Sequence, residues 1–292
     1  MIDSLNAVFQ KYNIKRDLDG KNYGEFFREN GYYLLPKSDL PVEKIAEIID
    51  LLLEREAWRG GWEGKEEYMK YKKNFQPGAY RLGNLLNKHE LFRKIITDKD
   101  ILNICFQILG DDVKIGGLDM REPKKGTGQQ DLHIDWIPKK KIEITENVVA
   151  MIFLDDSNED NGHLRVVPKT HKIKGWIEEN TEDKTKHPDE IFLDVKKSGV
   201  VFMDANLWHS GTTNKTGNRR RVLFMDIRRR NIPQLLNQRI YLDETIQKKL
   251  TDVQKYLLGV GENDSVFEER VFTAGNVYRK EFKTDGFVKM QD

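Results

Sequence analysis

The spacing of apolar side chains predicts helices in the first 110 residues. Apolar positions recur every three or four residues in four stretches, which cover 23–30, 40–54, 85–96 and 99–109. Gly31 and Gly110 directly follow the first and the last stretch, as is common at helix C-termini. Between the first two helices, the run 32–35 is typical of a short strand.

The middle of the chain has a different pattern. Short β-branched or apolar runs, bounded by Gly, Asn, Asp and Pro, predict strands at 113–120, 148–154, 163–167, 199–204 and 222–228. Several short strands at fairly regular intervals are typical of a β-sandwich or barrel. The charged stretch 172–198 interrupts this series, and it is either a functional lid or a solvated excursion.

Helical spacing returns after residue 230, most clearly at 244–258. No Pro-, Gly- or Ser-rich linker separates the helical parts from the strands. We therefore predict a single domain over 1–292, mainly β with α. It consists of a helical N-terminal part (about 1–110), a β-core (about 111–230) and a C-terminal helical extension (about 231–292).

Composition narrows the function classes. The 292 residues include 49 Lys+Arg and 48 Asp+Glu, so the net charge is +1, which argues against nucleic-acid binding through a bulk basic field. A lone cysteine, Cys105, rules out an intrachain disulfide and a Cys-rich zinc site. The longest apolar run, 148–154, is far shorter than the roughly 20 residues that span a bilayer. With no secretion signal visible, we expect a cytoplasmic protein without membrane or nucleic-acid partners.

Three residues are candidate metal ligands. His133 and Asp135 lie two positions apart, and in an extended strand this spacing directs both side chains to one face. His209, after a later strand, could complete a set of three. Two histidines and one carboxylate leave coordination positions open, as in non-haem Fe(II) oxygenases, whereas zinc sites more often use three histidines or cysteines.

A basic run provides a candidate anion site. Arg219, Arg220 and Arg221 directly precede the predicted strand 222–228. A planar guanidinium can bind a carboxylate through two parallel hydrogen bonds. Both alternating faces of this strand are apolar, so periodicity does not choose among the three arginines. The alternative is a solvated run of charge.

Taken in order, these motifs resemble a known family. The succession is His133-x-Asp135, the segment 162–171 (GHLRVVPKTH), the strand 199–204, His209-Ser210-Gly211 and Arg220. It is similar to the phytanoyl-CoA hydroxylase-like (phytanoyl-CoA dioxygenase) family of Fe(II)/2-oxoglutarate-dependent dioxygenases. The resemblance covers roughly 110–230, with a weaker likeness at 27–36. It implies a double-stranded β-helix (jelly-roll, cupin-like) core wrapped by N-terminal and C-terminal helices.

The resemblance also implies roles for single residues. His133, Asp135 and His209 would be the iron ligands, and Arg220, eleven positions after His209, would hold the far carboxylate of 2-oxoglutarate. Six further residues are expected to support the site. Ser210 or Thr212 would supply a hydroxyl for the cosubstrate, Gln130 and Asn206 would form hydrogen bonds near the ligands, and Trp136 and Trp208 would line the pocket or pack in the core.

The implied activity is oxidation, most commonly hydroxylation, of a small-molecule substrate, with O2 consumed and 2-oxoglutarate decarboxylated to succinate and CO2. Two alternatives use the same ligands: a cupin-like metal-binding module and a zinc-dependent hydrolase. A nucleic-acid demethylase is disfavoured by the neutral net charge. The basic runs 139–141 and 228–230 could favour an anionic substrate or be solvated surface. The substrate and the oligomeric state stay open.

Overall fold

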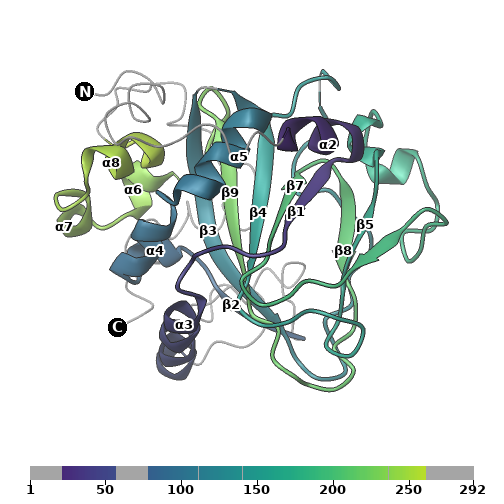
Figure 1. Cartoon of the computed structure of the whole chain (residues 1–292), viewed down its shortest axis with the longest axis horizontal. Helices are drawn as coiled ribbons and strands as arrows, with labels where there is room; N and C mark the ends of the chain where they lie inside the picture. Colours follow the sequence, from purple (N-terminus) through teal and green to yellow (C-terminus); the bar gives the residue numbers. More distant parts are fainter. Residues whose placement is uncertain (1–21, 57–77, 111, 140, 236, 261–292) are drawn as a thin grey trace.

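Two antiparallel sheets form the centre of the molecule. The computed structural model describes residues 22–56, 78–110, 112–139, 141–235 and 237–260. The larger sheet has the strand order β1-β7-β4-β9-β3-β2 and the smaller has β6-β5-β8 (Figure 1). The strands are β1 (Tyr32–Leu35), β2 (Ala79–Leu82), β3 (Val113–Pro123), β4 (Asn147–Phe153), β5 (Leu164–Val167), β6 (Ile191–Leu193), β7 (Val200–Asp204), β8 (Trp208–Gly211) and β9 (Val222–Arg229).

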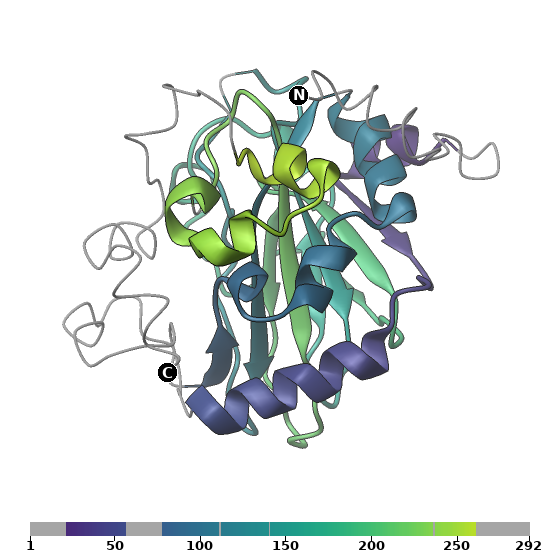
Figure 2. The same cartoon turned by 90° about the vertical axis from the view of Figure 1, so that its left-hand side faces the viewer.

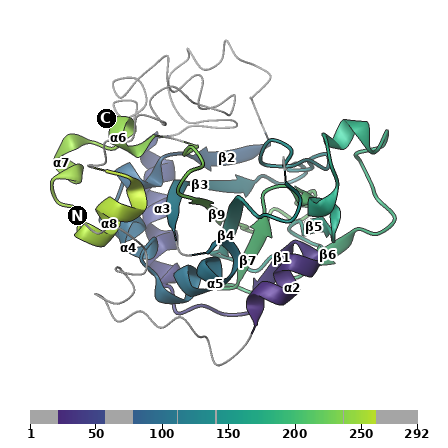
Figure 3. The ribbon, with the colours of Figure 1, turned by 90° about the horizontal axis from the view of Figure 1, so that it is seen from above.

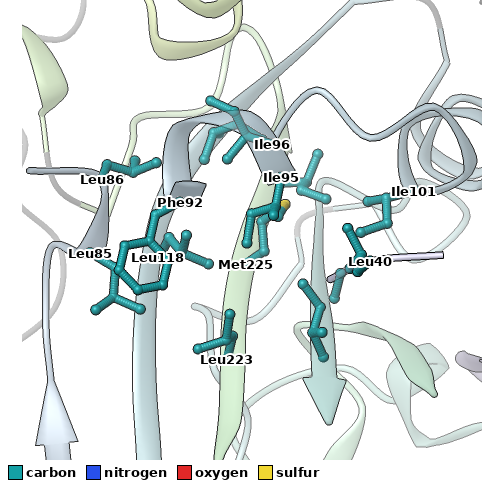
Figure 4. Packing of buried hydrophobic residues seen from close by; sticks show 14 of the residues in the cluster. Leu40, Leu85, Leu86, Phe92, Ile95, Ile96, Ile101, Leu118, Leu223 and Met225 are labelled. Atoms are coloured by element: carbon teal, nitrogen blue, oxygen red, sulfur yellow. The ribbon is translucent and has the colours of Figure 1, made fainter. Parts of the chain in front are cut away.

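Helices cover the outer face of the six-stranded sheet, the face turned away from the smaller sheet (Figures 2 and 3). They are α2 (Tyr23–Asn30), α3 (Val42–Glu56), α4 (Glu90–Ile95), α5 (Lys99–Leu109), α6 (Gln238–Tyr241), α7 (Glu244–Gln247) and α8 (Asp252–Leu258). Figure 4 shows the resulting core, in which Phe92 lies against Leu118 of β3. None of the helices in the described ranges is long and apolar enough to cross a membrane.

Alternation along the strands of the larger sheet gives its two faces different characters. On β3 and β9, Leu118, Met120, Leu223 and Met225 join the helix-covered core. The residues that alternate with them, including Arg121, therefore point to the inner face, towards the smaller sheet. On β4 and β7 the inner face is apolar, and it packs in a second core with residues of β5. Charge on the inner face is thus concentrated on the β2-β3-β9 side.

Most predicted elements are present, but two predicted helices are broken. Over 85–96, a 3₁₀ turn (Leu85–Asn87) precedes α4, and His89 in extended backbone caps α4 by accepting from Leu91 N at 3.1 Å. Over 244–258, Thr251 begins a new helix, α8, with a reciprocal capping box that also uses Gln254. In both places a capping side chain accepts from N–H groups at the start of the second helix, which stabilises the new start. The apolar spacing continues across the break, so the pattern alone does not reveal it.

The stretch 172–198 is more ordered than a plain loop. It contains a 3₁₀ turn (Ile177–Glu179) and the strand β6, which pairs with β5. The strands β2, β6 and β8 were not predicted, and each has only three or four residues. Cys105 is fully buried in α5, as expected of a small apolar side chain.

Candidate metal centre

The three candidate metal ligands converge at one point. One ligand atom from each of His133, Asp135 and His209 lies within 4.8 Å of the others. Nε2 of His209 is 3.4 Å from Oδ2 of Asp135, and Nε2 of His133 is 3.7 Å from Oδ1. The Asp135 side chain is 34% exposed, so the cluster is open on one side.

The small sheet brings these residues together. His209 lies in β8, and His133 forms an isolated antiparallel bridge with it, with N–H···O distances of 3.0 and 3.1 Å. Asp135 lies at a bend, where its N–H donates to the carbonyl of Ala205 at 2.8 Å. The backbone through 133–135 is thus not a regular strand: one bridge and one further backbone bond position the two ligands.

Backbone carbonyls fix the orientation of both imidazoles. Nδ1 of His133 is 2.8 Å from the carbonyl oxygen of Asp131, and Nδ1 of His209 is 2.9 Å from that of Leu207. With the proton on Nδ1 in each ring, Nε2 is left with its lone pair directed at the cluster. The prediction that Gln130 and Asn206 orient these rings is wrong, and Asn206 instead donates to the carbonyl of Ile137 at 2.8 Å.

The charges suit a divalent cation. Burial opposes ionisation of Asp135, but the two histidines outweigh it and hold the pKa of its carboxyl at about 2. Burial and the neighbouring His209 lower the pKa of His133 to about 4. Burial also acts against protonation of His209, yet the adjacent Asp135 carboxylate raises its pKa. At neutral pH the cluster therefore presents a carboxylate and at least one neutral imidazole.

The structure distinguishes the three consecutive arginines. Arg219 forms ion pairs with Glu122 and Asp50, and Arg221 with Asp155 and Asp50. Arg220 is buried, and its Nη1 donates to the carbonyls of Gly162 at 2.6 Å and His163 at 3.2 Å. Its buried Nε has no hydrogen-bond partner.

Burial lowers the pKa of Arg220 to about 10, which still leaves the guanidinium charged at neutral pH. A buried cation with an unsatisfied donor is a place where an anion would be stabilised. This fits a carboxylate-bearing cosubstrate.

Gly211 leaves space beside this guanidinium. It lies two residues after His209 on β8, so both residues face the same side. A Cβ built on Gly211 would lie 3.2 Å from Nη2 of Arg220, 3.4 Å from Oε1 of Gln130 and 3.5 Å from Nη1 of Arg121. Three polar groups thus surround a position without a side chain, on the ligand-bearing face.

The two predicted hydroxyl groups have partners within the protein. Oγ of Ser210 accepts from Nε of Arg165 at 2.5 Å, and the intervening position puts Ser210 on the opposite face of β8 from His209. Oγ1 of Thr212 accepts from the N–H of His163 at 2.7 Å. Their roles at the cosubstrate stay predictions. Gln130, the third supporting residue, borders the space at Gly211 beside Arg220.

Several buried charged residues were not predicted at all. Arg165 contacts Glu190, the carbonyl of Gln130 and Ser210, so it connects β5, the start of the metal motif and β8. Arg121 of β3 and Arg81 of β2 are directly opposed on the inner face. The sequence around Arg81 and Arg121 carries no motif, which is why no pattern indicated these two residues.

Lys139 and Arg228, one from each of the basic runs 139–141 and 228–230, have partners within the protein. Lys139 is buried and pairs with Asp204 at 2.5 Å, and Arg228 is fully buried and pairs with Asp226. The Arg228 guanidinium also lies 4.1 Å from the centre of the Trp136 ring. Lys139 and Arg228 are therefore neither the solvated surface nor the free anion site that the sequence suggested.

Comparisons with known proteins agree with this architecture. The family model of phytanoyl-CoA dioxygenase (PhyH) matches residues 27–222. HygX from Streptomyces hygroscopicus, solved with nickel, 2-oxoglutarate and hygromycin B, is 15% identical, with a TM-score of 0.55 over 70% of this chain and 86% of that one.

Two further structures are similar. The non-haem carbocyclase SnoK from nogalamycin biosynthesis is 20% identical, with a TM-score of 0.55 over 72% of this chain and 83% of that one. The epimerase SnoN, in complex with Fe3+, alpha ketoglutarate and nogalamycin RO, is 16% identical, with a TM-score of 0.54 over 71% and 82%. At these identities the likeness concerns the fold, and it confirms the predicted jelly-roll core.

Proposed function

The chain belongs to the phytanoyl-CoA dioxygenase family and is an Fe(II)- and 2-oxoglutarate-dependent enzyme, and from this premise we propose that it hydroxylates a small-molecule substrate at the 133/135/209 centre. His133, Asp135 and His209 are the proposed iron ligands. Bound iron and 2-oxoglutarate supply O2 activation coupled to decarboxylation of the cosubstrate to succinate and CO2. The chain itself binds, orients and shields these groups.

The convergence of the three ligand atoms within 4.8 Å carries this proposal. In each imidazole, a single hydrogen bond to a backbone carbonyl holds Nε2 towards the other ligand atoms. Such outer contacts fix the tautomer and the orientation of the rings before metal binds, which reduces the cost of ordering the site. Three protein ligands on one side leave the exposed side for the cosubstrate and the oxidant.

Arg220 is the proposed anchor for the far carboxylate of 2-oxoglutarate. Its guanidinium is buried, charged and adjacent to the space at Gly211, which lies on the same side of β8 as His209. The amide of Gln130 borders the same space and can donate to a carboxylate oxygen. We also propose that the whole chain acts as one domain, because β1 and β2 from its first 110 residues complete the larger sheet.

Hydroxylation is distinguishable from epimerisation, ring closure and desaturation by the fate of oxygen. The enzyme, Fe(II) and 2-oxoglutarate are incubated under ¹⁸O2 with small-molecule extract of the source cells, and products are identified by mass spectrometry. We expect a product that carries one heavy oxygen atom and forms in step with succinate. A product formed in step with succinate but without heavy oxygen would overturn hydroxylation and leave the enzyme class intact.

The zinc-hydrolase alternative makes a separate prediction. A hydrolase would turn over with Zn(II) and without O2, because its metal activates water. We expect no turnover of the same extract under these conditions. Anaerobic product formation with Zn(II) would contradict the proposal.

A further inference from the structure

We propose that Arg165 of β5, paired with Glu190, is a positioning residue for the cosubstrate, through which the segment 172–198 supports 2-oxoglutarate binding from behind β8. This inference rests on the proposed function, because it concerns how the same site holds its cosubstrate. It gives a role to a buried ion pair that lies outside the three proposed ligands and Arg220.

The strand β8 presents different side chains on its two faces. His209 and Gly211 face the metal cluster. Trp208 and Ser210 alternate with them and therefore face the opposite side, which we call the rear face. Arg165 is the cross-strand partner of Ser210, so its side chain shares the rear face.

The segment 172–198 packs against this rear face. Ile177 of the segment joins Trp208 in an apolar cluster. The carbonyl of Lys184 accepts from the N–H of Leu132 at 2.8 Å, directly before the first proposed ligand. These contacts lie behind the site, whereas a lid would close its open side, and they are more than a solvated excursion would make.

Arg165 connects the segment to the site through its hydrogen bonds. Its side chain is 3% exposed, and Nη1 donates to Oε2 of Glu190 at 2.9 Å and to the carbonyl of Thr185 at 2.6 Å. Nε donates to Oγ of Ser210 at 2.5 Å, and Nη2 donates to the carbonyl of Gln130 at 3.2 Å. One planar fork thus fixes three stretches of chain at once.

Two partners of this fork border the proposed cosubstrate space. The N–H of Gln130 donates to the carbonyl of Gly211 at 3.0 Å, and Oε1 of Gln130 would lie 3.4 Å from a Cβ built on Gly211. Nη2 of Arg220 would lie 3.2 Å from the same point. Ser210 directly precedes Gly211 in β8. A shift of Arg165 would therefore displace the amide that borders the space beside Arg220.

The carboxylate of Glu190 keeps the fork in place. A buried guanidinium without a paired charge is costly, and in the described ranges Glu190 is the acid that forms an ion pair with Arg165. Glu190 also accepts from the N–H of His187 at 3.2 Å, which ties it to its own turn. Loss of its charge would favour solvation of the Arg165 guanidinium and release Gln130.

Glu190→Gln tests the inference, because it removes the charge and keeps a hydrogen-bond acceptor of the same shape. The full chain is titrated anaerobically with Fe(II) and then with 2-oxoglutarate. Equilibrium dialysis gives the Kd for Fe(II), and the visible band gives the Kd for 2-oxoglutarate. We expect the Kd for 2-oxoglutarate to rise roughly fivefold, at the lower end of couplings between sites.

The affinity for Fe(II) should be unchanged in Glu190→Gln. The carbonyls of Asp131 and Leu207 orient the two imidazoles, and neither carbonyl accepts from Arg165. A merely structural role would instead weaken the binding of the metal and of the cosubstrate together.

Two variants of Arg165 separate its geometry from its charge. Arg165→Lys keeps a positive charge beside Glu190 but lacks the planar fork that reaches Ser210 and Gln130 together, so it should also weaken 2-oxoglutarate binding. In Arg165→Gln, the further change Glu190→Gln should have no additional effect, because Glu190 acts through Arg165. Losses that multiply in the double variant would contradict this.

Asp112→Asn is the matched control. It removes the carboxylate that pairs with Arg230 at 2.6 Å, and the same guanidinium donates to the carbonyl of Tyr256 in α8 at 3.0 Å, so the lost ion pair lies under the helices. Both dissociation constants should match those of the wild type.

Hydrogen exchange tests the wild-type protein without any substitution. Coupling is reciprocal, so bound 2-oxoglutarate should slow exchange in 181–190, although these residues lie behind β8. Exchange is measured by mass spectrometry on the anaerobic Fe(II) protein with and without 2-oxoglutarate. The helix α8 is the internal reference and should not change.

Three results would overturn the inference. They are an unchanged Kd for 2-oxoglutarate in Glu190→Gln, an equal loss of Fe(II) and 2-oxoglutarate binding in that variant, and exchange in 181–190 that bound 2-oxoglutarate does not alter. A wild-type protein without the 2-oxoglutarate band would contradict the proposed function itself. The three results are obtained only where that band forms, so the two failures are distinguished.

Discussion

The two faces of the six-stranded sheet are built from the same strands but differ in kind. The outer face, under α3, α4, α5 and α8, is lined by apolar side chains that are almost fully buried. The inner face on the β2-β3-β9 side carries Arg81, Arg121 and the Asp226–Arg228 pair. One face thus contributes most of the hydrophobic stabilisation, whereas the other holds charges that are costly to bury.

This difference indicates how the fold accommodates a reactive site. The apolar face stabilises the fold and holds the strands in register. The charged groups on the polar face can then stay at fixed positions although they do not stabilise the fold themselves. Substitutions of residues that line the proposed iron and cosubstrate site should therefore change ligand binding more than stability, and substitutions on the outer face should do the reverse.

Removal of a metal ligand should give the largest effect on the inner side. In His133→Ala, the proposed site loses one of three ligands, and Fe(II) affinity should fall by more than roughly 100-fold, beyond the usual cost of losing an outer contact. His133 is 36% exposed, so the thermal unfolding midpoint of the metal-free protein should change little. Equilibrium dialysis followed by metal analysis measures the affinity. Stoichiometric iron retained by this variant would contradict the ligand assignment.

The largest effect on the outer side should be on stability. Phe92 is fully buried in the helix-covered core, and Phe92→Ala should lower the free energy of unfolding by about 3–5 kcal/mol through lost burial and a cavity. Urea unfolding measures this change. Below the unfolding midpoint, the affinity for 2-oxoglutarate should match that of the wild type. A large loss of cosubstrate affinity in the folded variant would show that the two faces are not independent.

The adjacent arginines give a sharper comparison. Arg220→Gln should raise the apparent Kd for 2-oxoglutarate by roughly 30-fold or more, because about 2 kcal/mol is the lower end for breaking a buried charge pair. Arg219→Gln should leave the Kd unchanged, but it removes the ion-pair partner of the buried Glu122 carboxylate and should cost about 1–3 kcal/mol of stability. Anaerobic titration measures both Kd values. Equal effects would move the anchor away from Arg220.

Two glycines on the inner side give the most specific test. In Gly211→Ala the new methyl group would lie 3.2–3.5 Å from three side-chain ends, so the fold should tolerate it while 2-oxoglutarate binding weakens by roughly tenfold through overpacking of the space. In Gly116→Ala the Cβ would lie 1.8 Å from Oδ1 of Asp226, and stability should fall by about 3 kcal/mol. Thermal unfolding and cosubstrate titration separate the two results. Unchanged 2-oxoglutarate binding in Gly211→Ala would place the cosubstrate elsewhere.

The sequence predicted the fold where the patterns are long or repeated. The helix α5 and the strands β4, β7 and β9 have continuous apolar signals, and each was predicted to within one or two residues. The strands β2, β6 and β8 are too short to show a period, and they exist because neighbouring strands supply their hydrogen bonds. Likewise, no local pattern indicates the single bridge that holds His133, because its partner His209 is distant in the sequence.

The site was predictable to the extent that its residues lie in motifs. The spacing of His133 and Asp135 and the later His209 marked these three residues as candidate ligands from the sequence alone. Periodicity left the three arginines open, and the family resemblance pointed to Arg220. The tertiary structure adds the physical reason, because acidic partners from distant segments draw Arg219 and Arg221 away. Arg81 and Arg121 were not distinguishable among 49 basic residues, since only the pairing of β2 with β3 places them together.

The central claim is that His133, Asp135, His209 and Arg220 together hold iron and its cosubstrate. The most direct measurement is an anaerobic titration of metal-free protein with Fe(II) and then with 2-oxoglutarate, followed in the visible spectrum. The account predicts a weak metal-to-ligand charge-transfer band that saturates at one equivalent and is absent in Asp135→Ala. Tight stoichiometric iron binding without such a band, or a band that persists in Asp135→Ala, would contradict it.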